Sequence, residues 1–170
     1  MQMKNKPERI SNPFPPVADE NARVLILGSL PSEASRAAGF YYMNPRNRFW
    51  SVMTALLGED FTGMNSSEKA AALTRHRIAL SDVISSCEIH RSSDASIKDA
   101  KCTDIHAILV AAPIERILLN GGKAYALFIK YFPEYQFLAR QMPSTSPANA
   151  KLSLGDLVEA WGAELKRFFN

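Results

Sequence analysis

Four short apolar runs alternate along the chain with segments whose apolar residues recur every three to four positions. The runs lie at 23–29, 77–84, 115–121 and 135–142. Continuous apolar runs of this length predict strands that are buried on both faces, as in a parallel sheet. Strands that alternate with helices favour one sheet with helices packed on both sides.

The segments between these runs carry the spacing of helices. In the segment 45–58, Pro45 suits a first helical turn, and Phe49 and Trp50 belong to an apolar face that continues to Leu57. We therefore expect Phe49 and Trp50 to be core residues. Further helices are predicted at 66–76, 104–112, 122–132 and 153–169.

Short polar signals mark the starts of three helices. Asn65 with Glu68 has the spacing of a capping box, and Ser153 with Asp156 forms a similar signal. Thr103 is the predicted cap of the helix between them. The apolar positions of the last helix are Leu154, Leu157, Val158, Trp161, Leu165, Phe168 and Phe169.

The first 22 residues contain four prolines, which exclude a helix or a central strand there. We interpret 1–22 as an extended N-terminal arm. Residues 23–170 then form a single domain, which suits a chain of 170 residues that is 46% hydrophobic.

Composition sets limits on function. A net charge of +3 permits a polyanionic partner without requiring one. Two cysteines and three histidines are too few for the usual structural zinc site, so we expect no metal and two reduced thiols. No apolar run reaches the roughly 18 residues of a membrane span, and the N-terminus lacks a signal-peptide core, so we expect a cytoplasmic protein with no membrane contact.

Four segments follow the strands, where parallel α/β sheets bind their ligands. They are GSLPS (28–32), SSCE (85–88), NGG (120–122) and PSTSPAN (143–149). The first lacks the glycine and lysine spacing of nucleotide-binding loops, so an ordinary turn is an open alternative. The third opens a helix, where free amides favour an anion. The fourth holds three hydroxyls between prolines and could bind a phosphodiester. A tight connection is the alternative for the third segment, and a plain turn explains the fourth equally well.

The stretch YYMNPRNRFW (41–50) combines aromatic, amide and cationic side chains just before a helix. Tyr41 and Tyr42 could stack on a planar base. Arg46 and Arg48, with Arg36 nearby in the sequence, could meet phosphates. Together they indicate a nucleobase attached to a charged backbone.

Three polar residues near these segments have structural alternatives. Asn44 or Asn47 could simply cap the following helix. Asp82 ends an apolar run, where a carboxylate needs a partner or a function. Ion pairing or capping is the alternative to a place in the wall of a pocket.

Five segments resemble the uracil-DNA glycosylase superfamily, in particular its hypoxanthine-DNA glycosylase (DNA-deoxyinosine glycosylase) branch. They are RVLILGSLPS, GFYYMNPRNRFW, IALSDVISSCE, ILLNGGKAY and MPSTSPANA. The resemblance runs from about residue 13 to the last helix. It implies an α/β fold, a three-layer α/β/α sandwich with a central four-stranded parallel sheet, and a flipped nucleotide held at the carboxyl ends of the strands.

The resemblance also points to a catalytic residue. In the mismatch-specific uracil branch an Asn in the first motif positions water, but Leu30 stands there in this chain, and 28–32 contains no Asp or Glu. The second motif has Met142 where His or Asn is usual. The hypoxanthine branch instead supplies an asparagine from the PRN-x-FW segment, which is Asn47 here, with Asn44 as the fallback.

The implied site has two further parts. The base pocket is predicted from Gly28, Ser29, Leu30, Pro31, Tyr41, Tyr42, Ser81, Asp82 and Asn120, where Ser81 replaces a Trp that the family often has. The DNA-binding residues are predicted to be Arg46, Arg48, Ser144, Thr145, Ser146, Pro147, Ala148 and Lys151. Pro147 and Ala148 would be the apolar wedge, and the hydroxyls and Lys151 would grip phosphates.

The resemblance therefore predicts a monofunctional DNA glycosylase of base excision repair that removes a deaminated base, most simply hypoxanthine. Excision of uracil or xanthine is one alternative, and a DNA-binding domain with weakened catalysis is another. The expected partner is double-stranded DNA with a damaged base, bound by a monomer without a cofactor. No lysine matches a Schiff-base position, so no lyase activity is expected.

Overall fold

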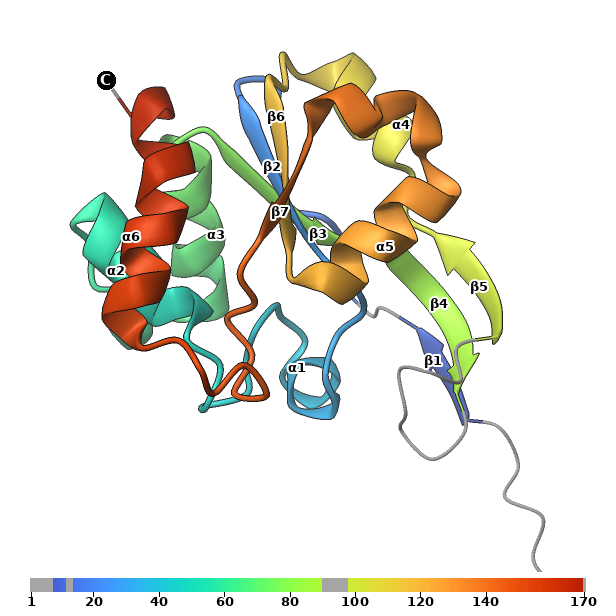
Figure 1. Cartoon of the computed structure of the whole chain (residues 1–170), viewed down its shortest axis with the longest axis horizontal. Helices are drawn as coiled ribbons and strands as arrows, with labels where there is room; N and C mark the ends of the chain where they lie inside the picture. Colours follow the sequence, from blue (N-terminus) through green and yellow to red (C-terminus); the bar gives the residue numbers. More distant parts are fainter. Residues whose placement is uncertain (1–7, 12–13, 90–97, 170) are drawn as a thin grey trace, which may run out of the picture.

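A central sheet of four parallel strands organises the molecule (Figure 1). The computed structural model describes residues 8–11, 14–89 and 98–169. The strand order is β3-β2-β6-β7. The strands are β2 (Val24–Gly28), β3 (Ile78–Asp82), β6 (Arg116–Asn120) and β7 (Ala139–Met142).

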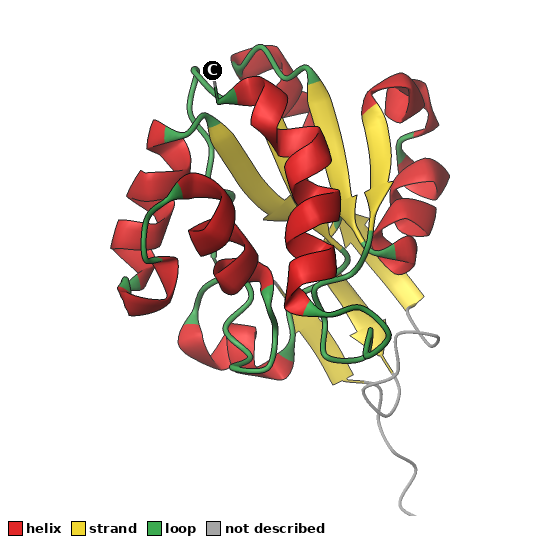
Figure 2. Cartoon of the chain, turned by 60° about the vertical axis from the view of Figure 1, so that its left-hand side comes forward, coloured by secondary structure: helices red, strands yellow, loops and turns green. Residues whose placement is uncertain are grey.

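Helices cover both faces of this sheet, as Figures 1 and 2 show from two sides. One face carries α2 (Phe49–Leu57), α3 (Ser66–Arg75) and α6 (Leu154–Leu165). The other carries α4 (Ile105–Ala111) and α5 (Gly122–Tyr131).

Alternate strand residues serve the two faces, so the inner strand β2 is apolar throughout, whereas the edge strand β7 exposes Arg140 and Gln141. In β2, Val24 and Ile26 join the first core, whereas Leu25 and Leu27 join the second. Phe49 and Trp50 are buried in the first core as predicted. The expectation of a three-layer α/β/α sandwich is confirmed.

The helix starts agree with the sequence signals at α3 and α6 but not at α2 and α4. The first helix was expected to begin at Pro45, but α2 begins only at Phe49. Both predicted capping boxes are present, at the starts of α3 and α6. At α4 the predicted cap, Thr103, is wrong: the Asp104 carboxylate accepts a hydrogen bond from the Ala107 N–H at 3.0 Å. The Thr103 hydroxyl instead donates to the carbonyl oxygen of Asp82 at 2.6 Å and ties the start of α4 to the end of β3.

The start of one strand and the burial of one helix residue differ from the predictions. The fourth strand begins only at Ala139, because Pro133 starts a 3-10 helix, η3 (Pro133–Leu138), where a strand was expected. Leu154 was expected on the buried face of the last helix, but it is 42% exposed at the first position of α6.

A second, antiparallel sheet and a short helix lie near the carboxyl ends of the parallel strands (Figure 1). The sheet has the order β1-β4-β5. Its strands were not predicted, because their sequences show no clear alternation of apolar and polar residues. SSCE (85–88) lies within β4, so its predicted place as a ligand loop is wrong. The strands of this sheet are β1 (Glu8–Ser11), β4 (Ile84–Ile89) and β5 (Lys98–Cys102), and the short helix is α1 (Glu33–Ala38). Two 3-10 helices lie elsewhere in the chain: η1 (Phe61–Gly63) and η4 (Lys166–Phe168).

The N-terminal arm packs on the domain where it is described. Val17 pairs with Leu80 at the edge of β3, with backbone N–H···O distances of 2.9 and 2.8 Å. Phe14 and Val17 are buried in the first core. Residues 1–7 and 12–13 of the predicted arm lie outside the described residues. Among the described helices, none has the length and apolar character to cross a membrane.

Candidate active site

A cavity of about 570 Å³ opens at the carboxyl ends of the parallel strands. Its lining comes from the segments 29–36, 41–47, 120–123 and 144–149, together with Asp82. Three of the four predicted ligand loops therefore meet at one place, and the stretch before α2 completes the wall. The volume suits a small-molecule or nucleobase site.

Asn47 lies on the cavity wall just before α2. Its Oδ1 accepts two hydrogen bonds, from the Phe49 N–H at 2.9 Å and from the Thr145 hydroxyl at 2.8 Å. The Asn47 Nδ2 group has no hydrogen-bond partner among the described residues. Asn47 thus bonds the first N–H of α2 from the position before the N-cap residue Arg48, and its NH₂ group is available to a ligand, so the two interpretations of this residue are compatible.

Asn44 also lines the cavity, and its side chain closes a local turn. Its Oδ1 accepts from the Arg46 N–H at 2.9 Å, and its carbonyl oxygen accepts from the Asn47 N–H at 2.9 Å. Asn44 therefore shapes the backbone that presents Asn47.

Asp82 and Tyr42 line the cavity and converge over the backbone of Gly28. A Cβ on Gly28 would stand 2.5 Å from Asp82 Oδ1 and 2.8 Å from the Tyr42 hydroxyl. Glycine is required there because it lets the two polar side chains approach the backbone. Gly28 itself lies beneath the cavity lining and does not form its surface.

Burial controls the ionisation of these two groups. Burial raises the pKa of Asp82 from 3.8 to about 7. Burial, and then the nearby Asp82 carboxyl, raise the pKa of Tyr42, while the Asn120 amide acts in the opposite direction. This part of the cavity wall is therefore neutral below pH 7 and gains a negative charge as Asp82 ionises around pH 7.

The two tyrosines of the stretch have different places. Tyr42 has a positive φ of 55° and stacks its ring on Phe49, with a centroid distance of 4.2 Å. Tyr41 was predicted as a stacking wall, but its ring is in the core: it is 2% exposed, packs edge-on against Phe14 and donates its hydroxyl to the Pro15 carbonyl at 3.1 Å. Tyr41 therefore borders the cavity without offering a ring face to a base.

Ser81 is a second correction to the predicted base pocket. It is 1% exposed and does not line the cavity. Neighbouring strand residues point to opposite faces, so the chain cannot direct both Ser81 and Asp82 into the same pocket. The other predicted pocket residues line the cavity: Ser29, Leu30, Pro31, Tyr42, Asp82 and Asn120.

The loop after β7 is held in place by Arg48. The Arg48 guanidinium donates to the carbonyl oxygens of Leu152, Ser146 and Asn149, the last at 2.8 Å. The predicted phosphate contact of Arg48 stays a prediction, and these bonds give the side chain a structural role first.

The predicted phosphate grips of this loop fall into two groups. Thr145 is fully buried, and its hydroxyl bonds to Asn47 and Asn120, so it cannot reach a phosphate in this structure. Ser144 and Ser146 line the cavity, with each hydroxyl oxygen accepting a bond from a loop N–H.

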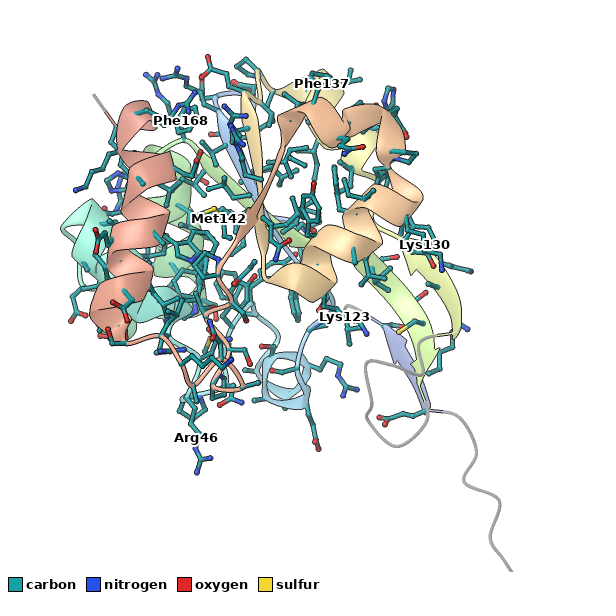
Figure 3. The ribbon with its side chains drawn as sticks, viewed as in Figure 1. Arg46, Lys123, Lys130, Phe137, Met142 and Phe168 are labelled. Carbon is teal, nitrogen blue, oxygen red and sulfur yellow. The ribbon has the colours of Figure 1, made fainter. Side chains whose placement is uncertain are left out.

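Four predicted DNA-contacting residues lie on the exposed surface. Pro147 and Ala148 are exposed at the rim of the cavity, and Lys151 is exposed further along the loop. Arg46 is exposed, and its side chain projects away from the body of the molecule (Figure 3). All four remain available to DNA.

Several lining residues were missed when the site was predicted from sequence. Ser35 enters from α1, which was not predicted, and Lys123 enters from the start of α5 (Figure 3). Arg36, which was considered as a phosphate contact, also lines the cavity from α1. Lys123 directly follows the NGG segment, and the interpretation of that segment as an anion site was the signal that could have identified it. The part of the chain that the structure describes contains no group of three His, Cys, Asp or Glu residues placed to hold a metal ion.

Comparisons with known proteins place this cavity in context. Residues 15–164 match the family model of the uracil DNA glycosylase superfamily. Two similar proteins are named hypoxanthine DNA glycosylase. The one from Methanosarcina barkeri is 32% identical over 91% of this chain and 97% of its own length. The one from Methanosarcina acetivorans is 33% identical over 85% of this chain and 91% of its own length.

A solved structure shares the fold. It is a solution NMR structure of a protein from Methanosarcina acetivorans described as a candidate uracil DNA glycosylase. The two chains superpose with a TM-score of 0.78 at 34% identity, over 92% of this chain and 97% of the other.

Proposed function

The chain belongs to the uracil DNA glycosylase superfamily and is a DNA glycosylase, and we propose that hypoxanthine is the base it removes. The observation that carries this proposal is the amide of Asn47, which faces the cavity while Leu30 occupies the place of the usual first-motif asparagine. The names of the two Methanosarcina relatives support the choice of base.

The chemistry suits a site built from neutral amides. Cleavage of an N-glycosidic bond can pass through an oxocarbenium-like sugar, as in glycoside hydrolysis, while the departing base gains electron density. Such a sugar reacts readily with water, so a strong general base is not essential. A donor amide aimed at the base stabilises the charge that develops there. Two hydrogen bonds to the Asn47 oxygen fix the orientation of its amide, and the NH₂ group is left as the donor for a ligand.

The base must leave the duplex to reach this cavity. Flipping costs a few kcal/mol, and less for a poorly paired base such as hypoxanthine opposite thymine. Pro147 and Ala148, exposed at the cavity rim, are the proposed wedge that fills the space left in the stack.

The test is a panel of duplexes that contain deoxyinosine, deoxyuridine or deoxyxanthosine, followed by alkaline cleavage. We expect strand breaks at deoxyinosine. Cleavage at deoxyuridine or deoxyxanthosine alone would replace hypoxanthine by the alternative base. Binding to every duplex without an abasic product would favour a domain with weakened catalysis.

Variants of the two asparagines test the catalytic assignment. We expect Asn47→Ala to lower the single-turnover rate by about 100-fold or more, the scale of losing one donor that stabilises developing charge. Asn44→Ala is the matched control, because it alters the same turn without removing the donor, and it should lose less. A larger loss in Asn44→Ala would move the catalytic role to Asn44, and equal losses would refute an assignment to Asn47 alone.

A further inference from the structure

Thr145 connects two of the asparagines that line the cavity, Asn47 and Asn120. It is fully buried at the end of the Pro143–Ser144 segment that follows β7. Its hydroxyl oxygen accepts a hydrogen bond from Asn120 Nδ2 at 2.9 Å, and its N–H donates to Asn120 Oδ1 at 3.0 Å. Its hydroxyl also lies 2.8 Å from Asn47 Oδ1.

These contacts fix the direction of each hydrogen bond. The Thr145 N–H can only donate, so the Asn120 atom facing it must be the oxygen, and the other Asn120 atom must be the NH₂ group. The Thr145 hydroxyl therefore accepts from Asn120 and gives its single proton to Asn47 Oδ1. The Phe49 N–H donates to the same oxygen, which independently sets the orientation of the Asn47 amide.

We propose that Thr145 is a positioning residue that holds the Asn47 amide with its NH₂ group toward the substrate. This rests on the proposed catalytic role of Asn47. Without the Thr145 hydroxyl, one of the two bonds that orient the amide is lost. The amide can then turn its carbonyl oxygen toward the departing base, where that oxygen would repel the developing negative charge.

The same arrangement gives Asn120 a supporting part. Each polar atom of its side chain makes one hydrogen bond to Thr145, which fixes the orientation of the amide and leaves one N–H and one lone pair for other partners. Asn120 was predicted to contact the base. The structure favours a relay in which Asn120 orients Thr145 and Thr145 orients Asn47.

The experiment compares Thr145→Val with Thr145→Ser. Valine keeps the shape of threonine but has no hydroxyl, whereas serine keeps the hydroxyl. On a deoxyinosine duplex we expect Thr145→Val to lower the single-turnover rate about 10- to 100-fold, the range for one lost orienting hydrogen bond. Thr145→Ser should stay within about threefold of the wild type, and the duplex Kd of both variants within about twofold, because the relay acts on the chemical step.

A double-mutant cycle separates positioning from general damage. If Thr145 acts through Asn47, then Thr145→Val should slow the Asn47→Ala variant by less than about twofold, since the amide it would orient is gone. An equal slowing in both backgrounds would overturn the proposal. So would a Thr145→Val enzyme with the wild-type rate, or a Thr145→Ser enzyme as slow as Thr145→Val. Should Thr145→Val fail to fold by circular dichroism, Thr145→Ala carries the same expectations.

A wrong choice of hypoxanthine as the substrate would give a different result from a wrong role for Thr145. In that case the wild type would leave deoxyinosine intact and release another base from the panel. The same variants assayed on that base would still test Thr145.

Discussion

The buried carboxyl group of Asp82 should make the protein less stable as the pH rises from about 4 to about 7. Asp82 is 3% exposed, and burial raises its pKa from 3.8 to about 7. In the unfolded chain the group ionises near 3.8. Between these values the unfolded chain releases the proton while the native protein keeps it, so stability falls with pH.

The size of the effect follows from the pKa difference. Each pKa unit corresponds to about 1.4 kcal/mol, so the rise at Asp82 costs on the order of 4 kcal/mol of unfolding free energy above pH 7. Below pH 3.8 both states are protonated and the cost vanishes. A cost of this size is a large part of the total stability of a typical domain.

Asp82→Asn removes the ionisation with little change of shape. We expect the difference in unfolding free energy, variant minus wild type, to rise by about 3 to 4 kcal/mol between pH 4 and pH 8 in the variant's favour. Urea denaturation at each pH measures it. Any pH-independent contribution of the new amide shifts the whole curve and leaves its slope unchanged.

Asp156→Asn is the matched control with the opposite sign. Asp156 is exposed in the capping box of α6, where hydrogen bonds from Ser153 lower the pKa of its carboxyl group. Its ionised form stabilises the fold, so this variant should lose stability relative to wild type as the pH rises through the acid range. A pH-independent difference for Asp82→Asn, or one with the sign of the control, would refute the assignment of a neutral buried carboxyl group.

Two further perturbations test the floor and the rim of the site. Gly28→Ala places a Cβ 2.5 Å from an Asp82 oxygen, so we expect a loss of about 1 to 3 kcal/mol in urea denaturation and a slower excision rate. Gly155→Ala in α6, whose nearest neighbour would be 3.7 Å away, should leave the excision rate unchanged and stability unchanged or slightly higher, and an equal loss of stability would contradict the crowding at Gly28. Arg46→Ala should weaken duplex binding and reduce the slope of log K against log salt by about 1, with the saturated single-turnover rate unchanged. An unchanged salt slope, measured by fluorescence anisotropy, would remove Arg46 from the DNA-contacting surface.

The pattern of apolar residues was enough to predict the parallel sheet and its helices. Each central strand is a continuous apolar run because both of its faces are buried, and the two capping boxes depend on contacts only three residues apart. The small antiparallel sheet was missed because β4 and β5 carry mixed polar residues whose pairing is not encoded in a local pattern.

The site was predicted less completely because side-chain direction depends on the backbone. Tyr41 and Tyr42 are chemically alike and adjacent, but the positive φ of Tyr42 turns its ring onto Phe49 while Tyr41 enters the core. Arg48 looks like a phosphate ligand in the sequence, and only the path of the loop after β7 reveals the carbonyl oxygens that it bonds.

Two segments that are about 100 residues apart in sequence are joined at this site. Arg48 follows Asn47 directly and holds the loop after β7 by its carbonyl oxygens, and the Arg48 N–H donates to the Thr145 carbonyl at 3.0 Å. Thr145 in turn bonds the side chain of Asn47. The loop that carries the proposed wedge and the residue that carries the proposed chemistry therefore form one hydrogen-bonded unit. Because of this connection, we expect a displacement of the loop to move the Asn47 amide as well.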